Sequence, residues 1–195
     1  MNSIYQIKII LDDVKPPIWR RIIVNSDTSL EDFHKIIQTT MGWTNNHLHQ
    51  FVKENYFYSN YNDLDNIFES MSKNVQIDYT DMVISDLLKK ENAKIKYDYD
   101  FGDGWQHTIL LETIKKNSIK IAYPKCVKGK RACPIEDCGG VYGYENLIEI
   151  MNNPKHPEYK GMLEWIGDYF EPEEFDIDIV NELLEDDDFG CDDMF

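Results

Sequence analysis

The strongest constraint on the fold is a strict alternation of side-chain types between residues 95 and 111. Apolar or aromatic side chains occupy every second position from Ile95 to Phe101, and the same period resumes at Trp105 and runs to Leu111. A period of two is that of a β-strand with one buried face. The two runs flank Gly102-Asp103-Gly104, and glycines supply the positive φ angles that tight turns need. The sequence therefore predicts a β-hairpin.

An earlier hairpin is predicted at the N-terminus. Residues 5–11 alternate in the same way, Pro16-Pro17 forms a turn, and the β-branched run 18–24 would return antiparallel. Arg20 and Arg21 are neighbours on this second strand, so their side chains should point to opposite faces of the sheet.

A helix is predicted next, over about residues 29–41. Thr28 and Glu31 have the spacing of a helix capping box, apolar residues follow at helical intervals, and Gly42 stops the pattern. A short strand over His47–Val52 comes after it. The hairpin, helix and strand together would resemble a β-grasp unit, and Val83–Lys90 is expected to form a short helix.

Three more helices are predicted after a loop rich in proline, glycine and cysteine over residues 124–140. Their apolar positions recur three and four residues apart, so each should lay one face on the core. They span about 143–152, 157–166 and 176–184. Residues 185–195 are strongly acidic and are expected to be a disordered tail. The sequence thus predicts a single α+β domain over residues 1–184, with an antiparallel or mixed sheet and C-terminal helices packed on it.

The charge balance disfavours nucleic acid as a partner. The formal net charge is −16, from 36 acidic and 20 basic residues, and a phosphate backbone would be repelled by such a surface. A local basic cluster exists at Lys125, Lys128, Lys130 and Arg131, for which solvated loop charge is the simpler explanation and a DNA-binding patch the alternative.

The start of the sequence and its cysteines indicate a cytoplasmic protein. The first residues lack the basic start and the long apolar stretch of a signal peptide, and no later run has the length of a membrane span. Four cysteines in such a chain are expected to be thiols or metal ligands rather than a disulfide framework.

The most reactive-looking run contains Asp100, Asp103 and His107. Two carboxylates and an imidazole could bind a metal ion or act as acid and base. The strand period argues against their convergence, because His107 shares a face with Trp105 while Asp100 points away from that face and Asp103 lies in the turn. The alternative is a hairpin corner with a hydrogen-bonded histidine in the core.

A zinc site is a second possibility. Cys126, Cys133 and Cys138 could supply three ligands, and His47, His49 or His107 a fourth, since tetrahedral zinc prefers thiolate and imidazole ligands. Their spacing lacks the close cysteine pair of common zinc sites. Free cysteines packed as small apolar side chains are the alternative.

Candidate binding residues lie in three stretches of the chain. His47, His49 and Phe51 would share one strand face, which could form a shallow binding surface, although histidines between aromatic residues often bond to neighbouring carbonyl groups instead. The candidates for ligand contact are Trp43, His47, His49, Trp105, Glu136 and Asp137.

Several of these motifs occur together in one known family. They are Lys15–Arg21, the helix and turn over Leu30–Trp43, His47–Phe51, Tyr99–His107 and Arg131–Glu145. In this order, from about residue 4 to 184, they resemble the plasmid pRiA4b ORF-3-like family, whose members are also described as TnpR-like passengers of insertion elements. The resemblance implies a fold and a setting on mobile elements, and it implies no particular reaction.

Two functional hypotheses follow. The first is a non-catalytic module that binds a protein or a small ligand through the loop 124–140 and the turn 102–104, since loops carry function more often than cores do. The second is a metal-dependent hydrolase built from Asp100, Asp103 and His107, with Glu136 or Asp137 brought in from the loop.

Overall fold

The computed structural model describes residues 3–60, 75–116, 119–167 and 169–191. Within these residues eight strands form one sheet, in the order β5-β4-β3-β6-β7-β1-β2-β8, and every neighbouring pair is antiparallel except β4 and β5. The strands are β1 (Ser3–Leu11), β2 (Trp19–Asn25), β3 (His49–Lys53), β4 (Tyr56–Ser59), β5 (Val75–Asp78), β6 (Lys94–Tyr99), β7 (Trp105–Lys116) and β8 (Lys125–Lys130). The helices are α1 (Leu30–Met41), α2 (Ile84–Leu87), α3 (Gly140–Met151), α4 (Tyr159–Trp165), α5 (Ile177–Leu183) and the 3-10 helix η2 (Asp187–Gly190).

This architecture confirms the predicted α+β class with a mixed sheet. Both predicted hairpins are present, and Tyr99 pairs with Trp105 across the second one. The positive φ angles of its turn fall on Asp100 and Gly104, and not on Gly102. The strands β6 and β7 lie between β1 and β3, so the N-terminal hairpin and β3 belong to one sheet without being neighbours.

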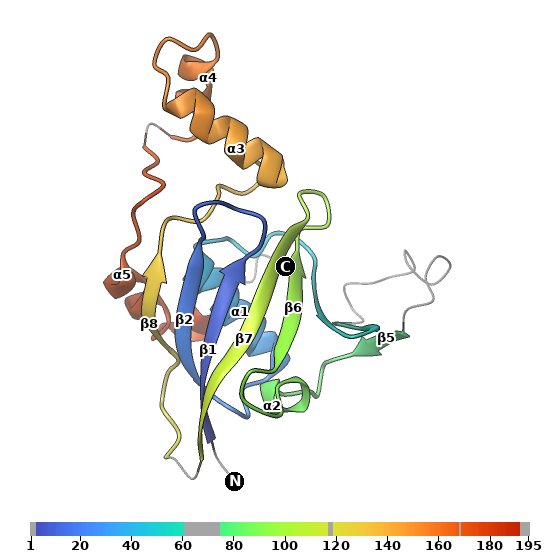
Figure 1. The fold of residues 1–195 in the computed structure, drawn as a ribbon. Helices are drawn as coiled ribbons and strands as arrows, with labels where there is room; N and C mark the ends of the chain where they lie inside the picture. Colours follow the sequence, from blue (N-terminus) through green and yellow to red (C-terminus); the bar gives the residue numbers. More distant parts are fainter. Residues whose placement is uncertain (1–2, 61–74, 117–118, 168, 192–195) are drawn as a thin grey trace.

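Helix α1 covers one face of the sheet (Figure 1). Its cap is Ser29, one residue later than predicted, whose side chain accepts a hydrogen bond from the Asp32 N–H, and it ends at Gly42 in the left-handed conformation. Apolar side chains of α1 and of the sheet fill the space between them. The fully buried ones include Ile7, Ile9, Ile22, Leu30, Phe33, Ile37, Phe51, Tyr97, Trp105, Ile109 and Leu111.

The acidic segment after α5 packs against the outer side of α1, which corrects the prediction of a disordered tail from residue 185. The Lys35 ammonium lies 3.0 Å from the Asp188 carboxylate, and the Thr39 hydroxyl donates to the Phe189 carbonyl over 2.7 Å. Phe189 and the buried Cys191 supply apolar anchors that the charge of the segment obscures in the sequence. Residues 192–195 lie outside the described part of the chain.

Helices α3 and α4 stand beyond the end of the sheet where the β6–β7 turn lies (Figure 1). Leu147 and Ile150 of α3 are buried, whereas α4 buries none of its residues. The predicted apolar stripe of residues 157–166 therefore does not rest on the sheet, and α5 is the C-terminal helix whose Val180 and Leu184 join the core. Across the described residues no helix is both long enough and apolar enough to cross a bilayer.

Candidate functional site

Three loops meet at the end of the sheet nearest α3. They are residues 42–48 between α1 and β3, residues 100–104 between β6 and β7, and residues 131–140 before α3; we call this place the loop junction. The register of the sheet brings the first two together, since His49 pairs with Tyr99 and the Asp100 N–H donates to the Leu48 carbonyl over 2.9 Å. His47 and Asp100 therefore become neighbours although 52 intervening residues separate them in the sequence.

Glu136 fastens the third loop to the other two. Its carboxylate accepts hydrogen bonds from the Thr44 N–H at 2.9 Å, the Thr44 hydroxyl at 2.5 Å and the Tyr99 hydroxyl at 2.5 Å. Burial, and then the nearby Glu136 carboxylate, raise the pKa of Tyr99, so its hydroxyl keeps the proton that it donates. The Trp43 indole N–H also donates to the Pro134 carbonyl, at 2.9 Å.

The β6–β7 turn touches the start of α3 as well. The Asp103 carboxylate accepts a hydrogen bond from the Gly139 N–H at 3.1 Å. Gly140 lies against the Asp103 backbone so closely that a β-carbon there would overlap its carbonyl oxygen. The turn 102–104 and the loop 124–140 thus meet, and the loop junction is held in one arrangement.

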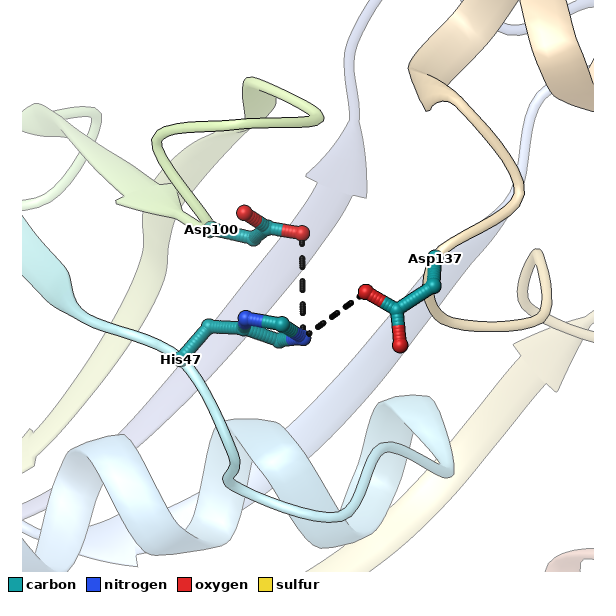
Figure 2. A group of neighbouring side chains, drawn as sticks. All are labelled: His47, Asp100 and Asp137. Carbon is teal, nitrogen blue, oxygen red and sulfur yellow. Dashed lines mark ion pairs between the residues drawn. The ribbon is translucent and has the colours of Figure 1, made fainter.

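His47, Asp100 and Asp137 point toward one another in this junction (Figure 2). The His47 Nε2 lies 3.4 Å from Asp137 Oδ1 and 3.8 Å from Asp100 Oδ2. The Asp100 side chain is almost fully covered, and its Oδ1 accepts from the N–H groups of Gly102 and Asp103. Each residue offers one ligand atom to a common centre, and these atoms all lie within 4.8 Å of one another.

The candidate catalytic residues Asp100, Asp103 and His107 do not meet at one centre. His107 has no exposed surface; its Nδ1 lies 3.3 Å from the Tyr97 carbonyl oxygen, and its ring meets Trp43 edge to face. Burial lowers the pKa of His107 to about 4, so it is neutral at physiological pH. Asp100 faces His47 and Asp103 faces Gly139, because alternation along β7 turns the imidazole into the core while the two acids belong to the turn.

The three cysteine candidates lie apart from any shared centre. In the described residues the one group of three or more potential metal ligands is that of His47, Asp100 and Asp137, and it contains no thiol. Cys126 and Cys138 point their thiols at the carbonyl groups of Lys128 and Gly140. Burial raises the pKa of Cys133 and of Cys138 to about 12, so both thiols are protonated at neutral pH.

The predicted binding residues divide into two groups. Trp43, His47, Glu136 and Asp137 lie in the loop junction. His49 and Trp105 lie beneath it: His49 stacks on His34 with ring centroids 3.4 Å apart, and Trp105 is fully buried. His47 precedes β3 instead of sharing its face with His49 and Phe51, so the three residues do not form the shallow strand surface that was one of the two alternatives.

The basic cluster of Lys125, Lys128, Lys130 and Arg131 is also divided. Arg131 is buried, donates to the Glu173 carboxylate at 2.7 Å and to the Pro16 carbonyl at 2.7 Å. The three lysines that remain lie on the edge strand β8, beside α5. These three lysines are exposed to solvent, an arrangement that both explanations of the cluster allow.

An open cavity of about 480 Å³ adjoins the loop junction. It lies between α3 and α4, and Asp137 belongs both to its wall and to the His47 group. Its other lining residues are Cys138, Gly143, Asn146, Leu147, Pro157, Glu158, Gly161, Met162 and Trp165. Neither the sequence period nor the motifs indicated this cavity, because α3 and α4 form it by packing on each other.

The fold and site define an α+β protein with one mixed sheet, whose joined loops carry a His-Asp-Asp group beside a cavity. The chain belongs to the plasmid pRiA4b ORF-3-like protein family, whose model matches residues 3–179. It is 31% identical over 166 residues to the uncharacterized protein y4hQ of Sinorhizobium fredii, covering 85% of this chain and 81% of that protein. It is also similar to the crystal structure of a protein of unknown function, MM3350 of Methanosarcina mazei Go1, with a TM-score of 0.77 and 33% identity over 91% of this chain and 97% of that one.

Proposed function

We propose that the protein is a non-catalytic binding module, encoded on plasmids or other mobile elements, that takes up a small organic molecule with a flat apolar part. The observation that carries this proposal is the cavity between α3 and α4. Ligand cavities commonly measure about 300–1,000 Å³ and combine apolar walls with a few polar groups. The family description, which names a plasmid reading frame, supports the proposed genetic setting.

The chemistry of the cavity walls favours a ligand with both apolar and polar parts. Leu147, Met162 and Trp165 supply apolar surface, and the Trp165 side chain is about half exposed at the rim. Asn146 and Glu158 supply hydrogen-bonding groups. An aromatic ring in this space would cover apolar surface that α3 and α4 leave in contact with water.

Blocking the cavity tests the proposal. A β-carbon at Gly161 meets no atom within 4 Å, so an indole in Gly161→Trp has room to fill the space. We expect the natural protein to bind the aromatic dye 8-anilinonaphthalene-1-sulfonate at one saturable site, and Gly161→Trp to abolish this fluorescence signal. Lys160→Trp, which adds the same side chain outside the cavity wall, is the matched control. Equal dye binding by both variants would contradict the proposal.

A metal-dependent hydrolase is the second candidate, and the proximity of His47, Asp100 and Asp137 is the observation that favours it. Such an enzyme would use these three residues and not Asp103 and His107, which face other surroundings. The assay is release of nitrophenol from p-nitrophenyl phosphate with added zinc or manganese. Saturable turnover that is lost in His47→Gln would favour this enzyme over the proposed binding module.

A further inference from the structure

We infer that His47, Asp100 and Asp137 bind one divalent transition-metal ion, with zinc as the best match to their ligand atoms. The inference rests on the geometry of three side chains from three separate loops, and it does not depend on what occupies the α3–α4 cavity. An imidazole nitrogen favours zinc and its neighbours over magnesium or calcium, which prefer oxygen ligands alone.

The separations from His47 are close to those around a single ion. Zinc bonds of about 2.0–2.2 Å in a tetrahedral arrangement place neighbouring ligand atoms roughly 3.3–3.6 Å apart. The His47–Asp137 separation of 3.4 Å is within this range, and the His47–Asp100 separation of 3.8 Å is slightly longer. The Asp137 side chain is 74% accessible, so its carboxylate has room to rotate toward Asp100.

The burial of the Asp100 carboxylate is a second reason to expect a bound cation. Its side chain is only 9% accessible, and within the described residues both hydrogen bonds that it accepts end on Oδ1. The other oxygen, Oδ2, faces the His47 ring at 3.8 Å, which is too long for a hydrogen bond. The negative charge of a carboxylate that is largely removed from water is costly unless a cation faces it.

The cation that faces these carboxylates could be a proton on His47 or a metal ion, and the charge balance favours the metal ion. A proton on His47 would leave two carboxylates facing one positive charge. A divalent ion bound to a neutral imidazole balances both carboxylates, so the group as a whole carries no excess charge. The neutral ring can then direct its nitrogen lone pair at the ion.

Neighbouring groups hold two of the three ligands in place. The N–H groups of Gly102 and Asp103 orient Asp100 through its Oδ1, and the Tyr99 ring meets the His47 ring edge to face with centroids 5.7 Å apart. Such contacts fix the direction of metal ligands before the ion arrives. Three protein ligands on a partly open surface leave a coordination position for water or for a group reaching over from the cavity at Asp137.

Calorimetric titration of chelator-treated protein with zinc chloride tests the inference. We expect one ion per chain. His47→Gln, Asp100→Asn and Asp137→Asn should each weaken binding by at least about tenfold, since even the loss of a residue that only hydrogen-bonds to a metal ligand weakens binding that much. His156→Gln, which changes a histidine far from the junction in sequence, is the control and should bind like the natural protein. Circular dichroism of each variant without zinc checks that it folds.

Two results would overturn the inference. One is zinc binding that persists unchanged in the folded double variant His47→Gln/Asp137→Asn. The other is zinc binding lost in Cys138→Ser but retained in His47→Gln, which would move the ion to the thiols. Gly161→Trp should lose dye binding and keep its zinc, so failure of the metal site and failure of the cavity proposal give different patterns.

Discussion

At the scale of single residues, the core holds three histidines away from water. His34, His49 and His107 are at most 7% exposed, and His34 and His49 stack face to face. Burial, and then the neighbouring His34, lower the pKa of His49, and burial lowers that of His107 to about 4. Both rings are therefore neutral in the folded protein. To gain a proton in acid, each ring would have to carry a charge in a buried place that disfavours charge.

The first prediction is a loss of stability in mild acid. An unfolded histidine titrates near 6.5 and folded His107 near 4, so the unfolded state binds more protons between these values and stability falls as pH drops below 6.5. The loss from His107 alone reaches on the order of 3 kcal/mol near pH 4, from about 1.4 kcal/mol per pKa unit. Urea denaturation across this pH range should show it.

His107→Phe should remove this part of the pH dependence, because phenylalanine does not titrate. The control is His156→Gln, which should keep the slope of the natural protein, since His156 lies outside the core. An unchanged slope in His107→Phe would show that other groups cause the acid sensitivity.

At the scale of elements, the β6–β7 turn and the start of α3 are in close backbone contact in the loop junction. Gly140 has a φ of +68°, and a β-carbon there would overlap the Asp103 carbonyl. We predict that Gly140→Ala destabilises the protein by about 2 kcal/mol or more, through strain at a positive φ and displacement of the turn.

The same substitution should also weaken zinc binding, because Asp100 and Asp137 lie in the two segments that it would push apart. Thermal unfolding and zinc titration measure the two effects. Gly161→Ala is the control, since a β-carbon there meets nothing. A Gly140→Ala protein as stable as the natural one would mean that the turn and α3 can separate freely.

The elements were more predictable from the sequence than their meeting points. The alternation of residues 95–111 and the glycine at position 42 set strands and a helix end locally, and both were predicted. Asp100 and Asp137 were candidates in the hydrolase hypothesis, but His47 was not, because only the β3–β6 register and the Glu136 hydrogen bonds bring their three loops together. No short spacing encodes such a contact.

For the acidic segment after α5, the sequence pattern pointed to disorder where the structure shows packing. Its charge indicated a disordered tail, yet Phe189 packs against the core and Lys35 of α1 faces Asp188. A lysine on the buried outer side of a helix gave no sign in the sequence that it had a carboxylate partner more than 150 residues away.

At the scale of the whole molecule, the sheet with α1 and the α3–α4 pair differ in how much they bury. Helix α4 buries none of its residues, whereas β1, β2, β6 and β7 place alternate side chains in the core. Segments with few buried contacts open locally at low free-energy cost. Local opening should therefore begin in α4.

Limited digestion with trypsin measures this difference. Among the lysine and arginine sites of the described residues, we predict that Lys155 and Lys160 are cut well before Lys94 and Lys96 of the central sheet, as mass spectrometry of the fragments would record. A saturating ligand in the cavity should slow the early cuts. Earlier cleavage in β6 than beside α4 would contradict this order.

Helix α1 is covered on one side by the sheet and on the other by the segment around Phe189. During protein synthesis the residues of α1 leave the ribosome long before residue 189 does, and β1 likewise waits for β7 to emerge. The nascent chain must therefore carry an incompletely covered helix until the residues around 189 have left the ribosome. Chaperones that hold emerging chains would meet this protein at that stage, and its yield in cells should depend on them.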